Sequence, residues 1–150
     1  MPVSIDPLDE ACQALVTRIN SAITYTLDQP ATYTHEIIDI LDEVDTTRVD
    51  VCPEGSGELQ ETLDVEDCSS HLIRVWVRAR LTDMLAATTA PLNLLTRKIF
   101  QRLNEYVTTD RRVRVYDCGK DRAERPGKMV LVKDLFYRAY IEMRVEVEAS

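Results

Sequence analysis

Apolar and polar residues recur with two different periods along the chain, and the longer period predicts two helices. Apolar positions at steps of three and four over residues 7–24 predict a first helix, which Asp6 caps and Pro7 opens. A second stripe of this kind runs from residue 89 or 90 to about residue 107, with Pro91 near its first turn. We therefore expect two amphipathic helices, each with one apolar side.

A period of two predicts the strands. It is clearest from Leu72 to Leu81, where apolar residues alternate with arginines and a tryptophan, as in a strand buried on one side. Shorter or less regular strand patterns cover residues 32–41, 48–52, 111–118 and 129–147. The first of these does not alternate cleanly, so a bend or bulge is expected within it.

The order α-β-β-β-α-β-β predicts an α+β fold, a mostly antiparallel sheet with two helices packed on one face. At 150 residues, of which 45% are hydrophobic, the chain is the size of one domain that spans residues 1–150. Segments at about 53–70 and 119–128 are rich in charge and turn-forming residues and poor in apolar ones. We expect them to be mobile loops.

Composition gives further expectations about location. No run approaches the roughly 18 to 20 apolar residues of a membrane helix, and the N-terminus lacks a secretory signal pattern. We expect a soluble cytosolic protein with no membrane partner. The cysteines, Cys12, Cys52, Cys68 and Cys118, are too far apart for a short zinc or redox motif and are interpreted as free thiols.

The net charge of −8 hides a strong asymmetry between the two halves of the chain. Residues 1–70 hold 16 acidic residues against two arginines, a net charge of −14, whereas residues 71–150 hold 16 basic residues against 10 acidic ones, a net charge of +6. Opposite charges on one molecule favour head-to-tail contacts between copies that close into a ring. The alternative, with equal weight, is that the two halves pair with each other inside one subunit.

Motifs that carry catalytic chemistry are not recognisable. His35 and His71 lie outside the metalloprotease and nucleophile-elbow patterns, and the acidic segment 39–45 lacks the spacing of a calcium loop. The segment 55–57 is too short for a phosphate loop. We therefore predict no catalytic, cofactor or metal site, and a protein that is not an enzyme.

One strand face has the composition of a binding site. Arg74, Trp76, Arg78 and Arg80 alternate with the apolar residues of the strand at 72–81. Such a face can bind nucleic acid, but a pI near 4.8 weakens affinity for phosphate, and arginine and tryptophan are also enriched in protein interfaces. We favour a protein partner, and expect Arg78 to be exposed, so that its reversal to glutamate would leave the fold intact.

Longer stretches of the sequence resemble a known family. They are TYTHEIIDILDEVDTTRVDVCPEG, HLIRVWVRARL, the Pro-Leu-led helix PLNLLTRKIFQRL and the closing FYRAYIEMRVEV. Together with the order of elements, they are similar to the tail terminator, or tail-completion, proteins of long-tailed bacteriophages, the minor-tail-protein-U-like proteins. The resemblance covers nearly the whole chain and implies a hexameric ring that caps the tail tube and joins it to the head-completion proteins of the neck. It implies a virion protein, assembled in the host cytoplasm, without a cofactor.

A ring around the genome would also give the two loops different roles, because its lumen should repel the DNA that passes through it. The lumen candidates are the acidic residues Glu54, Glu58, Glu61, Asp64, Glu66 and Asp67. The basic loop residues Lys120, Arg122, Arg125 and Lys128 are candidates for contact with the tube, the neck or the next subunit. Other tube, neck or baseplate ring subunits remain alternatives, as does a small cytosolic enzyme or ligand-binding domain.

Overall fold

The computed structural model describes residues 6–37, 46–54, 68–83, 85–116, 118, 127–130 and 135–148. Its elements are α1 (Pro7–Asn20), β1 (Thr32–Tyr33), β2 (Thr47–Pro53), β3 (Cys68–Leu81), α2 (Ala86–Leu103), β4 (Val113–Tyr116), β5 (Gly127–Val130) and β6 (Leu135–Glu148). The predicted α+β class and order of elements are confirmed, and the last predicted strand is divided into β5 and β6. No helix in the described part of the chain is long and apolar enough to cross a membrane.

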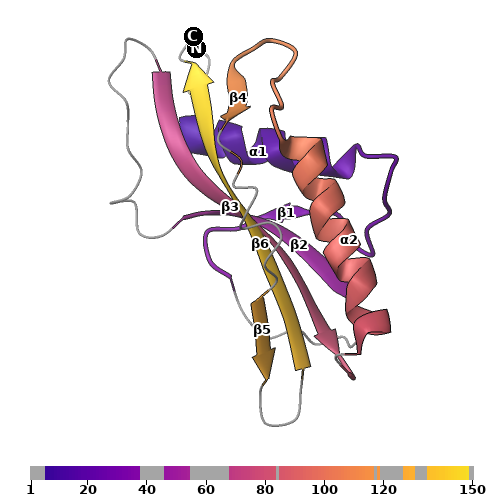
Figure 1. The fold of residues 1–150 in the computed structure, drawn as a ribbon. Helices are drawn as coiled ribbons and strands as arrows, with labels where there is room; N and C mark the ends of the chain where they lie inside the picture. Colours follow the sequence, from indigo (N-terminus) through magenta and orange to yellow (C-terminus); the bar gives the residue numbers. More distant parts are fainter. Residues whose placement is uncertain are drawn as a thin grey trace.

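Two long strands form the centre of the sheet. β3 and β6 pair antiparallel along their whole length, from Cys68 opposite Glu148 to Leu81 opposite Leu135. The strand order is β1-β2-β3-β6-β4, and β5 pairs with the other end of β6 (Figure 1). Among the described strands, the short β1–β2 pair is parallel and the other pairs are antiparallel, so the sheet is mixed and not purely antiparallel.

Both helices pack on the same face of this sheet. The predicted alternation in β3 is confirmed, because Ile73, Val75, Val77 and Ala79 are buried in one core with the helices. The helices contribute Leu8, Ala11, Cys12, Leu15, Ile19, Leu92, Ile99 and Leu103 to this core. A fully buried leucine or isoleucine stabilises a fold by about 1.5 to 3 kcal/mol, so this layer holds the helices on the sheet.

The start of α1 matches the prediction, and its end comes one turn earlier. The backbone N–H of Leu8 donates to Asp6 Oδ1 at 2.9 Å, and Pro7 occupies the first turn. The helix stops at Asn20, whose side chain pairs with both backbone groups of Ala31. These contacts secure the returning chain and replace the predicted last turn.

Helix α2 begins earlier than predicted and also ends earlier. Asp83 Oδ1 accepts hydrogen bonds from the backbone N–H of Leu85 at 3.0 Å and from the hydroxyl of Thr88 at 2.7 Å. These contacts fold the chain just ahead of the helix, which begins at Ala86 with Leu85 at its N-cap and no side-chain cap, and Pro91 lies in its second turn. The helix ends at Leu103, because the backbone turns away at the next residues, with Glu105 at a φ of 60°.

The weaker strand patterns agree less closely with the structure. The pattern over 32–41 forms only the two-residue β1, residues 34–37 are not in a strand, and residues 38–41 lie outside the described residues. Most of the predicted loops, at 55–67 and 119–126, also lies outside the described residues. The remaining loop positions belong to β2, β3 and β5, or to the short stretch after β2.

Candidate interaction surface

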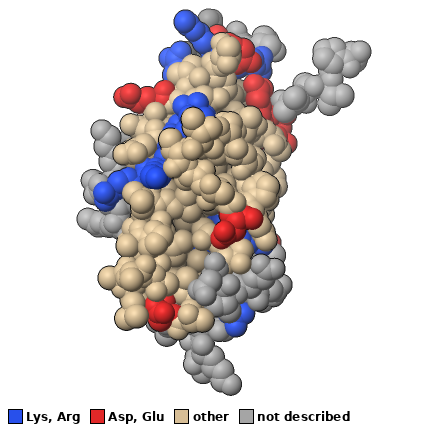
Figure 2. All heavy atoms as spheres, turned by 90° about the vertical axis from the view of Figure 1, so that its right-hand side faces the viewer, with Lys and Arg blue, Asp and Glu red and all other residues tan. Residues whose placement is uncertain are grey.

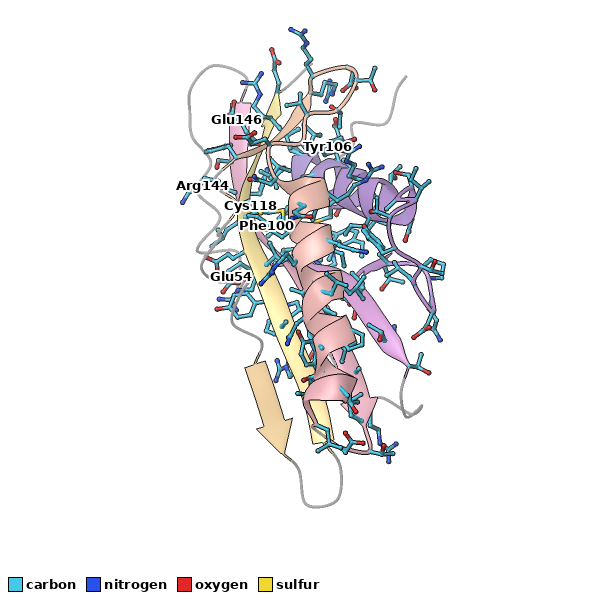
Figure 3. All side chains as sticks on the ribbon, turned by 45° about the vertical axis from the view of Figure 1, so that its right-hand side comes forward. Glu54, Phe100, Tyr106, Cys118, Arg144 and Glu146 are labelled. Atoms are coloured by element: carbon cyan, nitrogen blue, oxygen red, sulfur yellow. The ribbon has the colours of Figure 1, made fainter. Side chains whose placement is uncertain are left out.

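The side of the sheet opposite the helices has a different composition from the core side. Successive side chains of a strand point to opposite faces, so the neighbours of the core residues point away from the helices. We call this side the outer face and define it by Arg48, Asp50, Arg74, Trp76, Arg78, Arg80, Arg138, Tyr140, Glu142, Arg144 and Glu146. Figure 3 shows Glu54, Arg144 and Glu146 on this side, away from α1 and α2.

Arg78 is buried at the centre of the outer face, with 4% of its surface exposed. Its guanidinium donates to Asp50 Oδ2 at 2.9 Å, and Asp50 itself is 2% exposed. The other carboxylate oxygen of Asp50 accepts from the hydroxyl of Thr32 at 2.6 Å, so the aspartate ties β1, β2 and β3 together. The prediction that Arg78 is exposed is wrong, because neighbouring strands on both sides cover the residue, and the expectation that its reversal leaves the fold intact loses its basis.

Arg74 is half-buried and contacts acidic residues from both neighbouring strands. Its Nε donates to Glu142 Oε2 of β6 at 3.0 Å and also pairs with the carboxylate of Glu54 after β2. Glu54, one of the lumen candidates, is therefore an ion-pair partner of the sheet in this structure. Because a carboxylate paired with arginine repels phosphate less than an unpaired one, Glu54 is a weaker lumen candidate than the sequence suggests.

Two aromatic rings and two arginines form a cluster beside this ion pair. The rings of Trp76 and Tyr140 lie 5.1 Å apart at 45°. The guanidinium of Arg74 is 4.4 Å from the Tyr140 ring centre, and that of Arg138 is 4.9 Å from the Trp76 ring centre. All four residues are half-buried. The cluster presents pre-organised arginine and aromatic groups, the types that carry most of the binding energy in protein interfaces.

Only a few of the other predicted interface and lumen residues belong to the described part of the chain. Arg80 is half-buried near the end of β3, and the backbone of Lys128 belongs to β5. Outside the described residues lie Glu58, Glu61, Asp64, Glu66, Asp67, Lys120, Arg122 and Arg125. The structure therefore brings Arg74, Trp76, Arg78 and Arg80 onto one face as predicted. It adds Tyr140 and Arg138, which the sequence did not indicate as partners of Trp76.

Ion pairs between described residues join the acidic half of the chain to the basic half within one subunit. They are Glu54 with Arg74, Asp50 with Arg78, and Glu10 with Arg112, the last formed by two parallel hydrogen bonds of 2.8 and 2.9 Å. Of the two interpretations of the charge asymmetry, pairing inside the subunit is thus present in the structure. Contacts between copies remain a proposal. They would have to use charged residues that these ion pairs do not occupy.

One pair of candidate catalytic groups lies on the helix side of the sheet. Ser69 Oγ is 2.9 Å from His71 Nε2, the distance of a nucleophile and its base. His71 is buried, which lowers its pKa, and its Nδ1 has no hydrogen-bond partner within the described part of the chain. Side chains two residues apart in a strand point to the same face, so the sequence could have placed Ser69 beside His71. The known catalytic motifs do not include this spacing.

Other reactive groups are poorly placed for chemistry. Burial raises the pKa of the Cys12 thiol to about 12, so this cysteine is protonated at neutral pH. The hydroxyl of Tyr33 donates to Asp9 at 2.5 Å and lies 3.0 Å from His35 Nε2, an arrangement near the surface that links the end of β1 to α1. The described residues contain no group of three or more histidines, cysteines and carboxylates that could hold a metal ion.

Comparison with known proteins does not assign the chain to a family. No protein-family model matches it, and no curated protein is similar enough to count as a relative. The resemblance to phage tail terminators therefore depends on the sequence stretches and the order of elements described above.

Proposed function

We propose that this protein is a structural subunit of a bacteriophage tail, which forms a ring, caps the tail tube and joins it to the neck. The observation that carries the proposal is the resemblance of the sequence to tail terminators over nearly the whole chain. The order of helices and strands in this α+β fold agrees with that resemblance. The outer face adds support, because it holds the cluster of arginine and aromatic side chains around Trp76, which a protein partner would contact.

Within this proposal the cluster around Trp76 is the anchor for the tube, the neck or the next subunit. Its rings are held by Arg74 and Arg138, so little side-chain entropy remains to be lost when a partner binds. Arg78 stabilises the fold through its ion pair with Asp50. Genomic DNA only passes through the lumen of the ring.

The test combines electron microscopy with one pair of variants. We expect the purified full-length chain to form rings, alone or when mixed with preformed tail tubes, with about six subunits by averaged images. Trp76→Ala is expected to reduce ring formation or tube capping. Tyr106→Ala removes a comparable half-buried ring that stacks on Arg18 on the helix side, and is expected to leave both intact.

Two results would contradict the proposal. A protein that stays monomeric both alone and with tubes, at high concentration, has no ring-forming activity. Polymerisation of the chain into long tubes by itself would instead indicate a tube subunit.

A second candidate function is hydrolysis, which the Ser69–His71 contact favours. A reactive serine would be labelled covalently by a fluorophosphonate, and Ser69→Ala would abolish that labelling. A structural subunit is expected to show no labelling. The lack of an acceptor for His71 Nδ1 makes this pair the weaker candidate, because no described residue orients the imidazole through that nitrogen.

A further inference from the structure

His71 is a titratable residue at a core position of the sheet. It is 8% exposed and lies opposite Val145 of β6, which in turn lies opposite Val115 of β4. Ile73, two residues further along β3, belongs to the apolar core on the same side. A histidine therefore takes one place in a row of buried valines, at the end of the sheet where β3 begins and β6 ends.

The hydrogen bonding of the imidazole suits its neutral form. Nε2 lies 2.9 Å from Ser69 Oγ, and Nδ1 is buried without a partner among the described residues. A neutral imidazole carries a proton on one nitrogen only, so Nδ1 can be the nitrogen without a proton. A protonated imidazole carries a proton on both nitrogens, and Nδ1 would then be a buried donor of a cation without an acceptor.

The strands beside His71 turn their charged residues away from it. In β4 and β6 the buried residues alternate with charged ones that point to the other face, namely Arg114, Arg144 and Glu146. Glu54, after β2, pairs with Arg74 on that other face. Acidic and basic atoms are accordingly visible on the surface around this end of the molecule, at the top of Figure 2. Solvent screens such surface charges, so they do little to stabilise a cation in the core.

Helix α1 supplies the acidic groups nearest to His71 on the helix side. Asp9 and Glu10 already accept hydrogen bonds from other side chains. Burial lowers the pKa of His71 below its ordinary value of 6.5, and the weaker effect of Asp6, at the N-cap of α1, raises it. The positive end of the helix dipole also disfavours a cation there. His71 is therefore neutral at pH 7.

We propose that His71 makes this end of the sheet sensitive to acid: the neutral imidazole packs between β3, β4, β6 and the start of α1, and its protonation in mild acid opens the contacts among them. The open chain takes up the proton first as the pH falls through 6.5, so the stability that His71 contributes is complete above 6.5 and is lost toward its lower pKa in the fold. One proton changes the equilibrium between the closed and open forms by up to about tenfold per pH unit in this window. The proposal goes beyond the ring and does not depend on it.

Nuclear magnetic resonance of the full-length chain tests the protonation. The sequence has two histidines, His35 and His71, so His35→Gln assigns the two sets of imidazole signals. We expect the His71 signals to titrate below pH 6.5, and the methyl signals of Val115 and Val145 to change together with them. Titration of His71 at or above 6.5, or valine signals that do not change, would overturn the proposal. This experiment uses the native residue and needs no substitution at His71.

Hydrogen exchange tests the opening. The native chain and His71→Gln, whose amide takes up no proton in this range, are compared at the same pH, so that the pH dependence of chemical exchange cancels. For the amides of residues 69–73 and of β4, we expect the ratio of native to variant exchange rates to rise by up to about tenfold between pH 7.5 and 5.5. His35→Gln changes an exposed histidine and is the control, which should behave as the native chain does. A ratio for His71→Gln that stays constant would overturn the proposal, and leaves the proposed ring untouched.

Discussion

Arg78 shows how a single residue on the outer face serves the fold. It is a buried cation whose guanidinium pairs with a buried aspartate of the next strand. Arg78→Glu places a second carboxylate beside Asp50, and we expect a loss of about 3 to 5 kcal/mol in the free energy of unfolding, measured in urea. Arg97→Glu makes the same reversal at an exposed position of α2 and should change stability by no more than about 0.5 kcal/mol. Equal, small losses for both would show that the Arg78 pair is not buried in solution.

The sequence predicted which face Arg78 lies on, and predicted its exposure wrongly. Alternation along β3 reports the side to which each residue points. It does not report how neighbouring strands cover that side. Asp50 is 28 residues away from Arg78, and Glu142 is 68 residues away from Arg74. These pairings depend on strand register, which a residue pattern within one strand does not contain.

The two helices are joined at their C-terminal ends by a reciprocal pair of arginines. Arg18 Nε of α1 donates to the carbonyl of Arg102 at 3.2 Å, and Arg102 Nε of α2 donates to the carbonyl of Arg18 at 3.4 Å. Each cation also lies at the negative end of a helix dipole. Arg102→Met keeps the aliphatic stem and the backbone carbonyl that accepts from Arg18, and removes the bonds that the Arg102 guanidinium donates to the Arg18 carbonyl and to Ser21 Oγ, so we expect a loss of about 1 kcal/mol in urea unfolding. Arg97→Met in the same helix is the control and should have little effect on the free energy of unfolding. An equal loss for the two variants would show that the hydrogen bonds of Arg102 at the helix junction do not add to stability.

At the scale of elements, local signals in the sequence predicted more than long-range ones. Asp6 and Pro7 fix the start of α1 through neighbouring atoms, so the prediction there is confirmed. The ends of both helices were predicted too late, because contacts outside the helix set them. Asn20 pairs with Ala31 eleven residues later, and the chain after Leu103 turns toward β4. The mixed sheet has the same cause, since the β1–β2 pair joins segments 18 residues apart.

At the scale of the whole molecule, the proposed ring contact should weaken as salt rises. Ion pairs within the subunit already use Glu10, Asp50 and Glu54, so any ring contact between charged surfaces uses other charges, which salt screens. We expect sedimentation between about 0.05 and 1 M NaCl, where the Debye length falls from over 10 Å to about 3 Å, to show rings dissociating. Rings that persist unchanged at 1 M NaCl would show that apolar contacts, and not charges, hold the subunits together.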